Sequence, residues 1–144
     1  MRRDRGAQVV EFALIVPLVL ILIGAIVQFG FAFNRQVTVT QAAREGARLA
    51  AICGSTCSPK SVIQATKDAA PGLDPTKMTI TVQYCPADGS ACTGSVGSPG
   101  YCPANADQDT GDAVVIISYP SPIGEPLVSF GLKVHGKAHM PCGG

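Results

Sequence analysis

The chain has 144 residues, of which 47% are hydrophobic and 15% are charged, and its formal net charge is +1. The charged fraction is well below the roughly 25% that is usual in soluble domains. A near-neutral chain without tryptophan lacks the excess of lysine and arginine that a nucleic-acid-binding protein needs, and its hydrophobicity excludes a disordered tail. The length allows one domain, with or without a membrane segment.

An apolar run without charges extends from Phe12 to Phe33, over 22 residues in which only Gln28 is strongly polar. A helix of this length is about 33 Å long, enough to cross a hydrocarbon core of about 30 Å. The run exceeds the apolar core of a cleaved secretory signal, which has about 7 to 15 residues. A buried core helix would need more surrounding protein than this chain supplies. We therefore expect a transmembrane helix over residues 7–34.

The charges on either side of the apolar run indicate its orientation. Residues 1–6 read M-R-R-D-R-G, with three arginines against one aspartate. The positive-inside rule places this end in the cytoplasm. Residues 35–144, with eight basic and eight acidic side chains, are then expected to form a single extracytoplasmic domain.

The remaining pattern predicts an α+β domain. We expect the transmembrane helix to continue outside as one long helix to about Ile52, with Gly54 as a stop signal, and a short amphipathic helix to follow over 61–70. Three strands are then expected. Two of the segments alternate apolar and polar residues with a period of two, and the middle segment is a nearly continuous apolar run. These segments are Met78–Tyr84, Ala113–Tyr119 and Leu132–Met140. We expect a three-stranded antiparallel meander packed on the long helix, with the lysines of the last strand protecting a sheet edge.

The segment Gln41–Ala51 reads Q-A-A-R-E-G-A-R-L-A-A and places small residues at four-residue spacing. On a helix they form a small-residue seam, which allows another backbone to approach closely. The seam consists of two rows of residues, Ala42, Gly46 and Ala50, and Ala43, Ala47 and Ala51. Arg44 and Arg48 form a basic stripe beside it. Two interpretations are open: the seam packs on its own domain with the arginines in solvent, or it docks on the helix of a partner.

All six cysteines follow the apolar run, at Cys53, Cys57, Cys85, Cys92, Cys102 and Cys142. An even number in an exported domain predicts up to three disulfides, and the absence of C-x-x-C argues against zinc-ribbon and redox sites. Six cysteines allow 15 connectivities. Because the first and third strands of a meander end on the same side, we predict Cys85–Cys142. Cys92–Cys102 then closes the loop 86–111, and Cys53–Cys57 clamps the end of the helix.

The sequence contains no recognisable catalytic or metal-binding arrangement. His135 and His139 share one face of a strand but lie about 13 Å apart, too far to bind one ion. Asn105, Asp107 and Asp109 alternate as in a calcium loop, yet the required glycine and bidentate glutamate are missing. We expect a protein that is not an enzyme and has no metal, cofactor, small-molecule substrate or nucleic-acid partner.

The segment R-G-A-Q-V-V-E-F, in which Gly6, Ala7, Glu11 and Phe12 stand before the apolar run, resembles the processing site of type IV prepilin-like proteins of the Flp/Tad branch. The resemblance implies that a membrane-embedded prepilin peptidase cuts after Gly6, which makes residues 1–6 a leader peptide. Glu11 would then be the fifth residue of the mature chain. Its carboxylate can pair with the new ammonium group on Ala7 of a neighbouring subunit, so that one contact offsets two desolvation costs.

The segment Gln41–Ala51 resembles the A-A-R-x-G-A-R signature of the TadE-like family of minor pseudopilins. The resemblance implies a pilin-like, membrane-anchored minor pseudopilin of the bacterial cytoplasmic membrane that takes part in assembly of a Flp/Tad-type IV pilus. The implied partners are the membrane, the prepilin peptidase, other pilins or minor pseudopilins and the pilus assembly platform. The alternatives are a single-pass anchored extracytoplasmic binding or sensor module and, more weakly, a thiol oxidoreductase.

Overall fold

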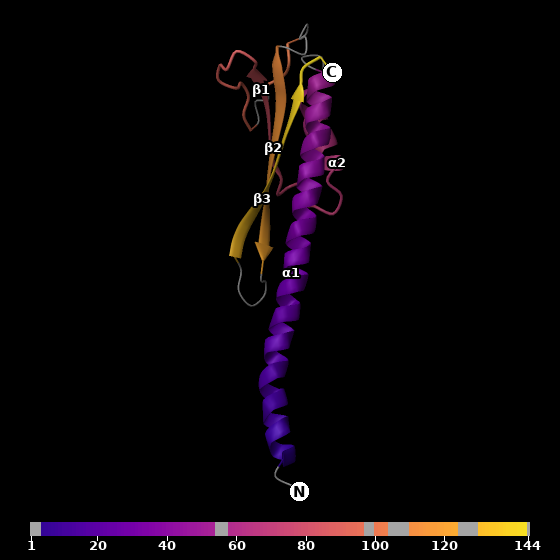
Figure 1. The fold of residues 1–144 in the computed structure, drawn as a ribbon. Helices are drawn as coiled ribbons and strands as arrows, with labels where there is room; N and C mark the ends of the chain where they lie inside the picture. Colours follow the sequence, from indigo (N-terminus) through magenta and orange to yellow (C-terminus); the bar gives the residue numbers. More distant parts are fainter. Residues whose placement is uncertain (1–3, 54–57, 97–99, 104–109, 124–129, 144) are drawn as a thin grey trace.

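The computed structural model describes residues 4–53, 58–96, 100–103, 110–123 and 130–143. The elements follow one another as α1 (Asp4–Cys53), α2 (Pro59–Asp68), β1 (Thr79–Pro86), β2 (Gly111–Ile123) and β3 (Phe130–Pro141). The three strands form one antiparallel sheet in the order β1-β2-β3. One end of α1 packs on this sheet and on α2, and its other end extends away from them (Figure 1). The predicted α+β class and meander are confirmed.

Helix α1 is continuous over 50 residues, through Pro17 and through the β-branched run Val37–Thr40. Such a run weakens helix propensity, but tertiary packing overrides propensity when the side chains find partners. Val39 is completely buried, and the hydroxyl groups of Thr38 and Thr40 donate to the carbonyl oxygens four residues before them, at 3.0 and 2.8 Å. The helix ends at Cys53, one residue after the expected end, and Gly54 lies outside the described residues.

The second helix begins two residues earlier than the predicted 61–70 and ends at Asp68. Its first residue is Pro59. Proline is favoured in the first turn of a helix, because the N–H group that it lacks would have no helical partner there. Thr66 on this helix is buried and donates its hydroxyl to the carbonyl oxygen of Val62 at 2.7 Å. That bond satisfies the polar group of Thr66 within its own helix and leaves its side chain free to pack against α1.

Two glycines bring the elements around α1 into close contact. A Cβ atom at Gly46 would collide with the side chain of Thr66 on α2. A Cβ atom at Gly136 on β3 would lie 2.6 Å from the carbonyl oxygen of Val39. Around these two points, the small-residue seam is inaccessible to solvent, with exposures between 0% and 3% at Ala42, Ala43, Ala47, Ala50 and Ala51. The seam therefore lies in the core of the chain's own domain.

Strands β2 and β3 are longer than expected, and together they continue past the end of β1. The register pairs Thr79, the first residue of β1, with Ser118, whereas the β2–β3 pairing continues to Ile123 and Phe130. Beyond Ser118 one edge of β2 has no neighbouring strand, which is where a sheet tolerates prolines such as Pro120 and Pro122. We call this two-stranded extension, residues 119–123 and 130–134, the β2–β3 ribbon.

Exchanging Gly46 for alanine tests the close contact between the two helices. Overpacking of this kind costs about 1 to 3 kcal/mol, which outweighs the gain in helix propensity of alanine over glycine. We expect Gly46→Ala to lower the free energy of unfolding of the outer domain by that amount, measured by thermal or denaturant melts in detergent. Gly30→Ala is the matched control, because an added Cβ there meets nothing within 4 Å. Equal stability of the two variants would contradict the packing described.

Candidate functional site

The N-terminal part of α1 carries the predicted processing residues. Gly6 and Ala7 lie within the helix, which begins at Asp4. Glu11 and Phe12 are both exposed, and no ion pair to Glu11 occurs among the described residues. The chain thus places a carboxylate and an aromatic ring on a free helix surface, next to the apolar run and about one turn from Ala7.

The apolar run of α1 is not covered by the rest of the protein. Its most apolar window has a mean hydropathy of 2.8, and none of it is buried. Long apolar side chains such as Leu14, Leu18, Leu22 and Phe29 are all more than half exposed. A core helix of this chain is therefore excluded, and α1 has the length and composition of a single-pass membrane anchor.

Of the two interpretations of the small-residue seam, the structure shows the packing of the seam within its own domain. Arg44 and Arg48 beside it are exposed. Arg48 binds Glu45 through two hydrogen bonds, Nη2 to Oε1 at 2.7 Å and Nε to Oε2 at 3.1 Å. This bond lowers the pKa of the Glu45 carboxyl group and raises that of Arg48. Because both side chains are exposed, the pair contributes little to stability, and the basic stripe remains open to solvent.

Arg35 and Gln36 on α1 bind the sheet, a role that the sequence pattern did not reveal. Arg35 Nη1 donates to the buried hydroxyl oxygen of Ser121 on β2 at 3.1 Å, and Gln36 Nε2 donates to the carbonyl oxygen of His135 on β3 at 2.7 Å. Arg35 is the first charged residue after the apolar run. Its position at the expected membrane boundary is the one sequence feature that could have suggested a special role.

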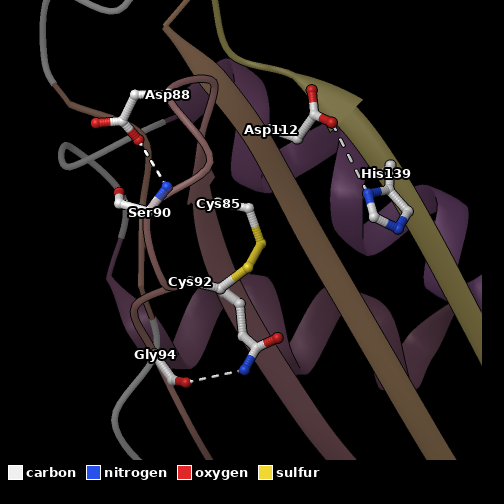
Figure 2. The surroundings of a disulfide bond; sticks show 8 residues. Cys85, Asp88, Ser90, Cys92, Gly94, Asp112 and His139 are labelled. Atoms are coloured by element: carbon white, nitrogen blue, oxygen red, sulfur yellow. Dashed lines mark hydrogen bonds and ion pairs between the residues drawn. A yellow bond between two sulfur atoms is a disulfide. The ribbon is translucent and has the colours of Figure 1, made fainter.

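The predicted Cys85–Cys142 bond is wrong, because the structure pairs Cys85 with Cys92 (Figure 2). The meander does bring the ends of β1 and β3 to the same side of the sheet. However, β2 lies between them, and two strand spacings are about 9.6 Å, beyond the roughly 7 Å that a disulfide can span between Cα atoms. Strand direction fixes the side of the sheet at which each strand ends but not this lateral distance.

The true partner of Cys85 comes from a turn inside the predicted long loop. Tyr84 and Thr93 exchange backbone hydrogen bonds of 2.8 and 2.7 Å, so the chain after β1 folds back beside it. The next residues on both sides, Cys85 and Cys92, form a close pair with a Cα–Cα distance of 4.1 Å. The carboxylate of Asp88 accepts the backbone N–H of Ser90 in this turn, and that bond lowers the pKa of Asp88 (Figure 2).

The predicted Cys92–Cys102 bond is also wrong, since Cys102 is bonded to Cys142. Both residues are almost completely buried, at 1% and 0% exposure, and the bond joins the segment 100–103 to the end of β3. Cys53 is also disulfide-bonded, but the predicted bond from Cys53 to Cys57 cannot be followed because Cys57 lies outside the described residues.

A cavity of about 450 Å³ lies beside the Cys85–Cys92 bond, at the end of the sheet where β1 and β3 finish. Asp112, Lys137 and His139 contribute to its wall, and His139 Nδ1 lies 3.8 Å from a carboxylate oxygen of Asp112 (Figure 2). The wall of the cavity carries side chains of both charge signs, such as Asp112 and Lys137. The sulfur atoms of Cys85 and Cys92 in this wall form a disulfide, so they provide no free thiol nucleophile. Among the described residues no three metal-ligating side chains gather at one place; Asn105, Asp107 and Asp109 lie outside them.

Comparison with known protein families identifies a match to part of the chain. A protein-family model described as TadE-like protein matches residues 6–48. The match begins at Gly6, covers the apolar run and ends within the small-residue seam, so the resemblance inferred from these two motifs is confirmed. Neither the curated proteins nor the solved structures contain a match to the chain.

The two described disulfides should differ in their contribution to stability. They close loops with sequence separations of 7 and 40 residues, for which chain-entropy estimates are about 2 and about 4 kcal/mol. We expect the double variant Cys102→Ala with Cys142→Ala to lose about twice as much unfolding free energy as Cys85→Ala with Cys92→Ala. Denaturant melts of both variants beside the unaltered protein measure this, and a reversed order would contradict the pairing.

Proposed function

The chain contains a TadE-like domain at residues 6–48 with a candidate membrane helix inside it, and we propose that it is a membrane-anchored minor pseudopilin of a Flp/Tad-type pilus. The domain match and the helix fit a membrane protein associated with the Tad pilus system. The proposal adds a role in pilus assembly, or in related secretion machinery, in the bacterial cytoplasmic membrane. This role is structural rather than enzymatic.

The observation that carries the proposal is the division of α1 into an uncovered part and a packed part. The apolar part is unburied, whereas the part from Val39 onward contributes to the core of the outer domain. A pseudopilin needs this division, because its helix must be free to pack in the membrane and against other subunits while its outer end holds a folded domain. Residues 1–6 face the cytoplasm and residues 35–144 lie outside in this arrangement.

We further propose that a prepilin peptidase removes residues 1–6. Helix α1 begins at Asp4, so Gly6 lies in its first turn, where the first N–H groups of a helix have no intrahelical partner. After cleavage the ammonium group on Ala7 and the carboxylate of Glu11 stand on the same helix. Glu11 has no ion-pair partner among the described residues, so the ammonium of another pilin or pseudopilin subunit can fill that place.

The mass of the mature protein tests the processing step. Purified from its native membrane, the protein should lack M-R-R-D-R-G and begin at Ala7, as read by intact-mass and N-terminal peptide analysis. Gly6→Leu should keep the full mass, while Gly24→Leu, a matched change farther along α1, should be cut normally. A wild-type protein that retains Met1 would instead favour the alternative, a single-pass anchored binding or sensor module.

The role of Glu11 is tested by removing its charge. Because loss of one partner from a desolvated ion pair costs about 3 kcal/mol or more, we expect Glu11→Gln to reduce co-purification with pilin subunits at least about tenfold. Glu11→Asp, which keeps the charge, should lose less, and intact mass verifies that both variants are still processed. Undiminished co-purification of Glu11→Gln would overturn the proposed pairing.

A further inference from the structure

The β2–β3 ribbon is a second part of the outer domain that reaches toward the membrane. Past the end of β1 the two strands continue without a third partner and run beside α1 in the direction of its N-terminus (Figure 1). The hydrogen bond from Gln36 to His135 and the contact of Val39 with Gly136 show that residue numbers on α1 and β3 rise together. The start of β3 therefore points toward the apolar run.

The length of the ribbon brings its end level with that run. From His135 back to Phe130, β3 covers about 16 Å, which corresponds to about 11 residues of helix. Counted back from Gln36 parallel to α1, this distance reaches about residue 25 of α1, which lies before Phe33 and within the part of α1 expected to be in the membrane. The ribbon diverges from α1 in Figure 1, so residue 25 is the farthest point along α1 that its end can reach.

The chemistry of the ribbon changes at this level. The sequence from Pro120 to Leu132 contains one charged residue, Glu125, which lies outside the described residues. Leu132 is 52% exposed although it lies in a strand, and Phe33 on α1 is also exposed. The next residue on β3 is a cation, Lys133, and Arg35 on α1 binds Ser121, which pairs with Leu132 across the ribbon. Apolar and aromatic side chains with cations just outside them are typical of a membrane–water interface.

We propose that the end of the β2–β3 ribbon enters the outer interface of the membrane and contacts lipid, with Leu132 at the acyl-chain boundary and with Lys133 at the phosphate level. This inference rests on the proposed membrane span of α1. Leu132 and the apolar side chains of α1 are both exposed, and lipid is the partner that covers both. The outer domain is then attached to the membrane at two points, which restricts its tilt about α1.

The absence of tryptophan from the chain allows a direct depth measurement. The full-length protein is reconstituted in phosphatidylcholine–phosphatidylglycerol vesicles as three single-tryptophan variants, Leu132→Trp, Leu22→Trp and Lys137→Trp. Lipids brominated near the headgroup or deep in the acyl chain then quench each fluorophore according to its depth. We expect Leu132→Trp to be quenched most by the shallow lipid, Leu22→Trp most by the deep lipid, and Lys137→Trp by neither.

Each other outcome overturns a defined part of the proposal. Quenching of Leu22→Trp without quenching of Leu132→Trp overturns the lipid contact and leaves the membrane span intact. A blue-shifted but unquenched Leu132→Trp shows that protein, such as a second copy, covers the ribbon. Absence of quenching at Leu22 overturns the membrane span itself and the lipid contact with it. If Leu132→Trp fails to fold, Gly131→Trp replaces it, because Gly131 is exposed and an added Cβ there meets nothing within 4 Å.

Discussion

The close approach of α1 to its neighbours is the constraint on which the outer domain depends. Gly46 and Gly136 bring α2 and β3 against one helix, and alanines fill the space between them. The small side chains of α1 let the neighbouring elements approach closely, and those elements supply larger buried side chains such as Val62, Ile80 and Ile117. Such a core leaves little room for adjustment. It holds the sheet at one height along α1, and every feature farther along the sheet takes its position from that contact.

The two parts of α1 are helical for different physical reasons. In the packed part, tertiary contacts hold β-branched residues such as Val39 in a helix against their propensity. In the uncovered part, the proposed lipid environment removes the competition of water for backbone hydrogen bonds, which makes the helix the favoured state there. The same constraint explains why Arg35 and Gln36 bind the sheet. They stand where the two environments meet and join the first residues after the apolar run to β2 and β3.

The disulfides stabilise the part of the domain that has the least regular structure. Between β1 and β2, the described residues 87–96 and 100–103 include an isolated bridge, Thr93 to Tyr84, and Cys85–Cys92 and Cys102–Cys142 attach them to β1 and to the end of β3. The proposed extracytoplasmic location permits such bonds. They lie at the end of the sheet away from the β2–β3 ribbon, so the cross-linked end of the domain and the end proposed to contact lipid are separate.

Much of this structure follows from the sequence alone, because the determining signals are local. Hydrophobic length identifies the apolar half of α1, a period of two identifies the strands, and a period of four identifies the small-residue seam. The motifs at Gly6 and at Gln41–Ala51 likewise contain enough information to reveal the TadE-like resemblance. Only the tertiary structure decided that the seam packs on Thr66 and Gly136 and that Cys85 bonds to Cys92 rather than Cys142. It also decided that the β2–β3 ribbon extends past the end of β1. These features depend on distances between segments far apart in the chain, which no local period encodes.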